Sequence, residues 1–248
     1  MAPAHRISVF PDAPSVAREL ASRVAAFLRR KPALVLCLPT GRTPLLLYEE
    51  LAKRVAAGTA DFSEAITFNL DEFFGIPPSH PGSYRSFMQR YLFDKVGIPP
   101  SHVHFLDGSA PDPLAECCRY EKAIDDAGGI DLQILGIGAN GHIGFNEPGP
   151  ALEARTHRIA LQTETRRSNA DLFGGDPGAV PSEALSMGMA TILGARSIVL
   201  VATGERKASC VERLMTGSIT TALPASFLQL HHDVEILLDD AAASKLVL

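Results

Sequence analysis

The amino-acid sequence predicts an α/β fold in which a mostly parallel sheet is flanked by helices on both faces. Short apolar runs alternate along the chain with amphipathic helical patterns, and this alternation is typical of a parallel sheet. The run 33–38 (ALVLCL) is apolar throughout and 130–137 (IDLQILGI) is nearly so, as expected of strands that are covered on both faces. Because 248 residues suit one domain, we expect a single domain over residues 1–248.

Local patterns predict the individual elements. Residues 7–10 (ISVF) are mostly apolar and are expected to form a strand. In 14–30 apolar residues recur at intervals of three and four, which predicts an amphipathic helix. The strand at 33–38 ends at PTGRTP, and Pro44 opens the next helix at a position that tolerates proline. The remaining predictions are strands at 65–70, 102–106, 130–137, 197–202 and 234–238, and helices at 83–95, 112–127 and 205–215.

One stretch, 138–180, breaks this alternation. It is rich in Gly, Pro, Asn, Thr and Arg, and a long irregular segment in a compact domain is typically a functional loop. We therefore expect a lid segment at about 148–180. Ligands of parallel α/β sheets bind beyond the carboxyl ends of the strands. Candidate site residues are therefore expected where strands end, at 39–44, 69–75, 136–148 and 203–207.

Charge and composition limit the classes of function. A net charge of −5 argues against a general nucleic-acid-binding surface. Every apolar run is shorter than the roughly 20 residues of a membrane span, and the N-terminus (MAPAHRISVFPD) lacks the apolar stretch of a signal peptide. The four cysteines include an adjacent pair and no CxxC spacing, which suits reduced thiols. We expect a cytoplasmic protein that binds neither nucleic acid nor membrane.

The motif LPTGRTP, at 38–44, follows a strand and opens a helix. Gly41 allows close approach of the backbone to a ligand, Thr40 and Thr43 supply hydroxyls, and the helix start supplies free N–H groups. These features favour an anion pocket, most plausibly for phosphate. The spacing is not that of a Walker A loop. The alternative interpretation is an ordinary capped helix start.

The motif FNLDEFFG, at 68–75, places two carboxylates directly after a predicted strand. Asp71 is a candidate general base, and Glu72 would then point elsewhere. The alternative interpretation is turn or capping chemistry.

The motif GIGANGHIGFNEPG, at 136–149, is dense in glycine, which indicates close approach of the backbone to a ligand. His142 and Glu147 suggest an acid/base imidazole that is oriented by a carboxylate. A zinc site is the alternative, but one His and one Glu supply too few ligands and no HExxH occurs. Arg166 and Lys207 are candidates to complete the anion site, and their alternative is a solvated surface charge.

Together these segments resemble the glucosamine-6-phosphate deaminase (glucosamine/galactosamine-6-phosphate isomerase) family. The match is collinear from about residue 36 to 230. The combination of NLDE with GHIGFNEPG is its most specific part. The other matching motifs are LPTGRTP, HPGSYRSFM, TRRSNADLF, VPSEALSMGMATIL, TGERKA and LQLH.

The resemblance implies a modified Rossmann-like fold and a reaction without metal or cofactor. In that reaction glucosamine 6-phosphate and water become fructose 6-phosphate and ammonia, by aldose–ketose isomerisation coupled to amine loss. Asp71 would move the proton between C2 and C1, His142 would assist ring opening, and Glu147 would hold His142. The substrate and its 6-phosphate would be bound by Thr40, Gly41, Arg42, Thr43, Gly138, Arg166 and Lys207.

Two residues depart from the family pattern. Asn140 stands where some members have an aspartate of the ring-opening relay, so His142 and Glu147 would act without a third titratable group. Arg42 stands where a small residue is usual. It either points to solvent or adds a phosphate contact, and we expect the second. The segment that begins the lid lacks the basic pair of allosterically activated members, so the resemblance implies a monomer or small homo-oligomer.

Three other functions are weighed against this one. Galactosamine 6-phosphate is the alternative substrate, because motifs for phosphate and C1–C2 chemistry cannot separate C4 epimers. A 6-phosphogluconolactonase shares the fold but lacks FNEP after the histidine. A non-enzymatic sugar-phosphate sensor has no need of Asp71 and His142 together.

Overall fold

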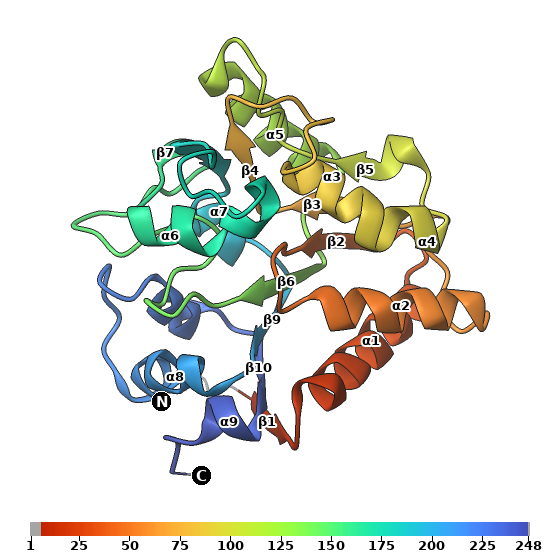
Figure 1. Cartoon of the computed structure of the whole chain (residues 1–248). Coiled ribbons are helices and arrows are strands. Elements are labelled where there is room, and N and C mark those ends of the chain that lie inside the picture. Colours follow the sequence, from red (N-terminus) through yellow and green to blue (C-terminus); the bar gives the residue numbers. More distant parts are fainter. Residues whose placement is uncertain (1–5, 248) are drawn as a thin grey trace.

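A seven-stranded parallel sheet forms the centre of the molecule, in a computed structural model that describes residues 6–247 (Figure 1). Each of its strand pairs is parallel, which confirms the predicted sheet type. In spatial order the strands are β1 (Arg6–Phe10), β10 (Val234–Asp239), β9 (Ser197–Ala202), β6 (Leu132–Gly136), β2 (Val35–Leu38), β3 (Ile66–Asn69) and β5 (Val103–His104).

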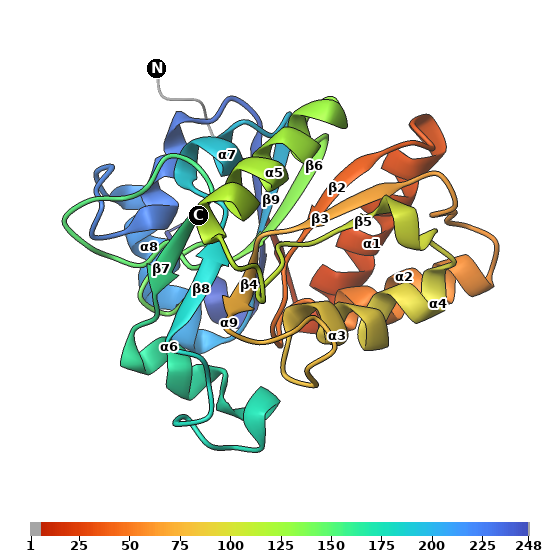
Figure 2. The ribbon, with the colours of Figure 1, turned by 90° about the horizontal axis from the view of Figure 1, so that it is seen from above.

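Helices cover both faces of this sheet, as predicted (Figure 2). One face carries α1 (Ala13–Arg30), α2 (Leu45–Ala56) and the continuous run of α3 (Tyr84–Met88), the π-helical η1 (Gln89–Phe93) and α4 (Asp94–Val96). The other face carries α5 (Pro113–Asp126), α7 (Met189–Leu193), α8 (Ala208–Thr216) and α9 (Asp240–Ala243).

Strand β2 shows how the sequence fills these two layers. Successive side chains of a strand point to opposite faces, so Leu36 and Leu38 join the core under α1 and α2. Val35 and Cys37 join the core on the α5 side. All four are buried, which is why the run reads as continuously apolar.

A second sheet of three antiparallel strands was not predicted from the sequence. Strand β3 confirms the strand expected at 65–70, but the chain then enters a further strand, β4 (Asp71–Phe74), which was not expected. Strand β4 pairs with β8 (Glu183–Ser186), which pairs in turn with β7 (His157–Ala160). These strands have four residues each, too few for a clear alternation of apolar and polar residues.

The stretch expected to be irregular contains regular structure. Besides β7 it holds α6 (Thr163–Ser168) and the 3₁₀ helix η3 (Ala170–Phe173). The lid role of 148–180 stays a prediction. Further 3₁₀ segments are η2 (Pro100–His102) before β5, η4 (Glu205–Lys207) at the start of the predicted helix 205–215, and η5 (Pro224–Leu230).

Two further expectations concern membranes and thiols. None of the helices found between residues 6 and 247 has the length and apolar character that crossing a bilayer requires. The expected absence of a signal peptide depends partly on residues 1–5, which lie outside the described residues. All four cysteines are free thiols.

Candidate active site

A cavity of about 870 Å³ lies at the carboxyl ends of β2, β6 and β9, which are neighbours in the main sheet. The loops that follow these strands supply about half of its wall, as expected for a parallel α/β sheet. The predicted site residues that line it are Thr40, Gly41, Arg42, Thr43, Asp71, Gly138, Asn140, His142 and Lys207. The cavity therefore brings together residues from four separate strand ends.

One part of the wall is suited to an anion. The loop after β2 carries Thr40 and Thr43, and Gly41 between them has a φ of +95°, a conformation that favours glycine. Lys207, the last residue of η4, lines the same cavity. Burial lowers the pKa of Lys207 from its ordinary value. A bound anion would favour the protonated, charged form of this lysine and so oppose the effect of burial.

The η4 loop is held in place from the end of β10. The backbone N–H of Gly204 donates to both carboxylate oxygens of Asp239, at 3.0 Å each. Asp239 also accepts the N–H of Ala242 at 2.8 Å and so caps α9. Lys207 is therefore presented by a loop that is fixed to the sheet.

Asp71 is the first residue of β4, where the chain passes from the main sheet to the small one. It is 6% exposed and lines the cavity. Burial, and then the adjacent Glu72 carboxylate, raise the pKa of Asp71 to about 8. A carboxylate with this proton affinity can exchange a proton near neutral pH.

Glu72 turns away from the cavity. Its Oε1 accepts the N–H groups of Phe73 at 2.8 Å and Tyr84 at 2.9 Å, and its Oε2 accepts that of Arg85 at 2.9 Å. The carboxylate thereby satisfies backbone donors at the start of α3. Of the two adjacent acids, Asp71 faces the cavity and Glu72 supports its wall.

His142 lies on the glycine-rich loop after β6, with its imidazole packed against Gly138. A Cβ at position 138 would lie 2.3 Å from Cε1 of the ring, so only glycine leaves the ring in this place. Burial lowers the pKa of His142, which the nearby Glu147 carboxylate opposes. Nδ1 is buried and has no hydrogen-bond partner among the described residues. The imidazole is therefore held mostly neutral beside a carboxylate.

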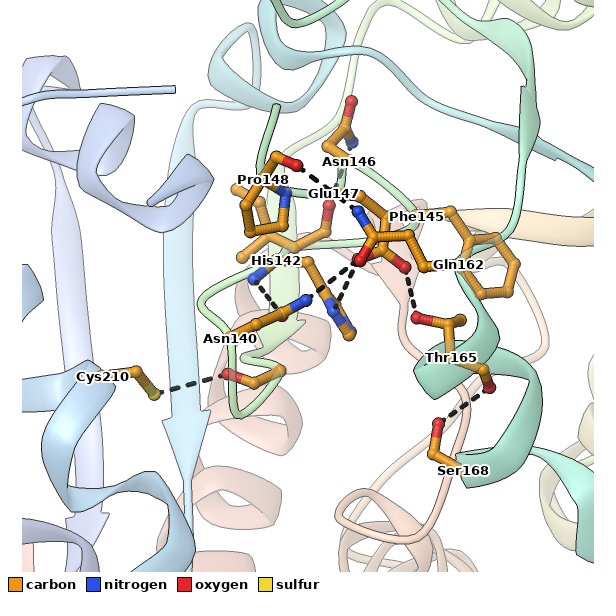
Figure 3. A network of polar contacts seen from close by, with 12 residues as sticks. Asn140, His142, Phe145, Asn146, Glu147, Pro148, Gln162, Thr165, Ser168 and Cys210 are labelled. Carbon is orange, nitrogen blue, oxygen red and sulfur yellow. Dashed lines mark hydrogen bonds and ion pairs between the residues drawn. The ribbon is translucent and has the colours of Figure 1, made fainter. Parts of the chain in front are cut away.

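Asn140 and Glu147 form a polar network next to this ring (Figure 3). Asn140 accepts the backbone N–H of His142 at 3.2 Å and donates from Nδ2 to Oε2 of Glu147 at 3.0 Å. Oε2 of Glu147 lies 3.8 Å from Nδ1 of His142, close enough for an ion pair but too far for a hydrogen bond. The other oxygen, Oε1, accepts the hydroxyl of Thr165 from α6.

Two predicted residues lie differently from the rest. Glu147 is 7% exposed and stands behind His142, outside the cavity lining. Arg166 also does not line the cavity, because its guanidinium donates to the carbonyls of Val180 at 3.1 Å and Gly178 at 3.2 Å. Its assignment to the phosphate stays a prediction.

Several cavity residues were missed from the sequence, and two of them, Tyr84 and Thr165, make hydrogen bonds within the site. Tyr84 is 4% exposed, and its hydroxyl donates to Oδ1 of Asn169 at 2.9 Å. Thr165 lies immediately before Arg166 and contacts Glu147. Both lie in motifs that match the family, HPGSYRSFM and TRRSNADLF. These motifs marked the segments, but they did not indicate a role for the tyrosine or the threonine.

In the part of the chain that the structure describes, no group of three or more His, Cys, Asp or Glu side chains is placed to hold a metal ion. The cavity lining combines two titratable side chains, Asp71 and His142, with a wall of hydroxyl groups and a lysine that is suited to an anion.

A parallel α/β sheet with such a cavity beyond its strand ends defines a Rossmann-like protein with an enzyme-type site. Within that class, the chain belongs to the family described as glucosamine-6-phosphate isomerases/6-phosphogluconolactonase, whose model matches residues 12–237. This result confirms the family resemblance inferred from the motifs.

Curated relatives match nearly the whole chain. A glucosamine-6-phosphate deaminase of Rhodopirellula baltica is 49% identical over 240 residues, which cover 97% of this chain and 95% of the relative. One of Beutenbergia cavernae is 46% identical over 242 residues, covering 98% and 93%. The similarity therefore extends over nearly the whole length of this chain and of both relatives.

Solved structures agree on the fold. A structure described as a monomeric glucosamine-6-phosphate deaminase superposes with a TM-score of 0.92 at 39% identity, covering 96% of this chain and 99% of that one. A 6-phosphogluconolactonase from Trypanosoma cruzi superposes with a TM-score of 0.79 at 20% identity, covering 100% and 99%. The second likeness shows the shared fold alone.

Proposed function

We propose that this chain converts glucosamine 6-phosphate and water to fructose 6-phosphate and ammonia. The observation that carries the proposal is the placement of Asp71 and His142, which reach one cavity from the ends of different strands, beside an anion-binding wall. A reaction with separate acid and base steps needs two titratable groups in different environments. Relatives at 46% and 49% identity that are named glucosamine-6-phosphate deaminase support the same reaction.

Binding of the 6-phosphate fixes the substrate. The loop of Thr40, Gly41 and Thr43 offers N–H and hydroxyl donors, and Lys207 offers a positive charge. A dianionic phosphate held there places C1, C2 and the ring oxygen near side chains on the other strand ends. The phosphate wall thereby orients the sugar for both proton transfers.

Ring opening is assigned to His142. The neutral imidazole takes the proton of the C1 hydroxyl and, as the imidazolium, gives a proton to the ring oxygen, so the C1–O bond to the ring breaks and an open-chain aldehyde forms. Glu147, whose Oε2 is 3.8 Å from Nδ1, balances the charge when the ring is protonated. Asn140 holds the carboxylate at this distance through its 3.0 Å hydrogen bond.

Isomerisation is assigned to Asp71. Its carboxylate removes the proton from C2, the C–H electrons form a C1–C2 double bond, and the C1 carbonyl π electrons move to O1, which takes a proton from the C2 ammonium group. The resulting enolamine takes the proton back from Asp71 at C1 while the nitrogen lone pair forms a C2–N double bond. Water hydrolyses this iminium to the ketone with release of ammonia as ammonium. The positive amino group of the substrate beside Asp71 favours the ionised carboxylate, which burial alone disfavours.

We also infer a monomer or small homo-oligomer that acts in the cytoplasm. The solved relative at 39% identity is described as monomeric, which supports a single functional chain. The free thiols Cys37, Cys117, Cys118 and Cys210 support a reducing compartment. Size-exclusion chromatography with light scattering tests the assembly.

The deciding experiment measures ammonia release from glucosamine 6-phosphate and galactosamine 6-phosphate side by side, with EDTA present. We expect release from the gluco epimer, and none from an Asp71→Asn variant that still binds the sugar phosphate. Release from the galacto epimer alone would keep the mechanism and change the substrate. A folded wild type that releases ammonia from neither would overturn the proposal and make lactone hydrolysis the next assay.

A further inference from the structure

Thr165 reaches the acid/base network from outside the glycine-rich loop. It lies in α6, eighteen positions after Glu147, and its hydroxyl donates to Oε1 of that carboxylate (Figure 3). Both side chains are buried, with Thr165 3% and Glu147 7% exposed. A hydrogen bond to a buried charged group is among the stronger ones in proteins.

The backbone around Thr165 fixes the direction of this hydroxyl. The carbonyl of Thr165 accepts Oγ of Ser168 at 2.9 Å, Nδ2 of Asn169 at 2.9 Å and the N–H of Asn169 at 3.2 Å. Oδ1 of Asn169 accepts the hydroxyl of Tyr84 from α3 at 2.9 Å. The segment that carries Thr165 is therefore tied both to its own helix and to the opposite wall of the cavity.

We propose that Thr165 is a positioning residue for the acid/base pair, through which α6 of the predicted lid holds the Glu147 carboxylate against His142. With Thr165 on Oε1 and Asn140 on Oε2, both oxygens are occupied and the carboxylate cannot rotate. The catalytic geometry then depends on the seating of α6. The part of this inference that concerns catalysis rests on the proposed function.

Removing the Thr165 hydroxyl changes the electrostatic environment of the His142 imidazole. Oε1 would lose a donor, so more negative charge would face the imidazole and favour its protonated form. The charged groups that act on His142 are Glu147, Lys207 and Glu164, and the last two are untouched by a change at Thr165. A shift in the titration of His142 would therefore report on the Thr165–Glu147 contact.

The test compares Thr165→Val with Thr165→Ser, which keeps a hydroxyl, and with Thr165→Ala, which adds no bulk. Thr156→Val is the matched control. Thr156 is also buried and donates to a carboxylate, Glu121, at 2.5 Å, but neither lines the cavity. The readouts are the titration of the His142 ring by NMR, which needs no substrate, and kcat and KM for glucosamine 6-phosphate.

We expect Thr165→Val and Thr165→Ala to raise the His142 titration midpoint by about half a pH unit. They should lower kcat roughly tenfold with little change in KM. Thr165→Ser should restore both, and Thr156→Val should leave both unchanged. The inference is overturned if Thr165→Ala leaves the midpoint and kcat as in the wild type, or if Thr156→Val reproduces its changes. A wild type without deaminase activity overturns the proposed function instead, while the titration still decides the contact.

Discussion

Arg42 and Asp171 form an ion pair that joins the loop after β2 to η3, two segments that both line the cavity. The two side chains stay largely in solvent, at 78% and 63% exposure. Exposed ion pairs contribute between about 0 and 1 kcal/mol. The pair therefore biases the position of η3 over the cavity rather than stabilising the fold. It also occupies the guanidinium that we expected to contact phosphate.

Replacing either partner should have a small effect that depends on salt. We expect Arg42→Ser and Asp171→Asn each to change KM less than about fivefold, with the double variant no worse than either alone. The difference in KM between each variant and the wild type should disappear at high ionic strength. KM measured at low and high salt checks this. If Arg42 instead binds phosphate, Arg42→Ser will raise KM strongly, and Asp171→Asn will lower it by freeing the guanidinium.

The raised pKa of Asp71, about 8, predicts a pH dependence of activity. The base must be ionised to remove the C2 proton, so kcat/KM should rise with pH until about 8. Asp71→Asn should abolish turnover at every pH while sugar-phosphate binding is retained. A pH–rate profile with its acidic limb near the ordinary carboxyl value would show that Asp71 is not the group that titrates.

The same carboxyl links stability to pH. Its pKa is raised from 3.8 when the chain folds, so the folded state holds the proton more tightly than the unfolded state. The stabilisation is complete below about pH 4 and is lost as the pH rises towards 8. Asp71→Asn should therefore increase the free energy of unfolding relative to the wild type at pH 8, by at least about 1 kcal/mol, and less at pH 5. Denaturant unfolding at both pH values measures the difference.

Glu72→Gln is the matched control for Asp71→Asn. Both Glu72 oxygens accept backbone N–H groups. In Glu72→Gln the side-chain NH₂ would face at least one of these N–H donors, and that hydrogen bond would be lost. We expect a loss of about 1–3 kcal/mol of stability with kcat largely kept. The two variants should thus differ in opposite ways: Asp71→Asn loses activity and gains stability, whereas Glu72→Gln keeps activity and loses stability.

The sequence could predict those site residues that directly follow a predicted strand. Asp71, His142 and Lys207 follow β3, β6 and β9, three strands that were predicted from the sequence, and the carboxyl ends of parallel strands meet at one edge. Their convergence could be expected from the alternation of elements. Asn140 and Glu147 were within reach because they share the glycine-rich loop with His142.

The rest depended on contacts between segments far apart in the chain. Thr165 meets Glu147 only because β7 and β8 carry α6 back over the cavity, and these short strands gave no periodic signal. Arg166 was expected at the phosphate, but its guanidinium is held by carbonyls at Gly178 and Val180. Such pairings are set by tertiary packing, which local patterns do not encode.

Lys207 should act mainly on binding. In the proposed phosphate site its charge would act equally before and during the reaction, so Lys207→Ala should raise KM at least tenfold with little change in kcat. Lys122→Ala, which removes an exposed lysine paired with Asp126 on α5, is the control and should change neither. Initial rates over a range of substrate concentrations decide it. An unchanged KM for Lys207→Ala would remove this residue from the phosphate site.

Gly138→Ala tests the placement of His142 most directly. The new methyl would lie 2.3 Å from Cε1 of the imidazole and 2.6 Å from Nε2, so the ring must leave its position. Gly136→Ala, two residues earlier, meets nothing within 4 Å. We expect Gly138→Ala to lower kcat at least about a hundredfold, as the loss of a positioned acid/base group does, with KM changed far less. Gly136→Ala should keep near-normal rates. Equal activity of the two variants would show that the imidazole does not need this position for turnover, and the assignment of ring opening to His142 would fail.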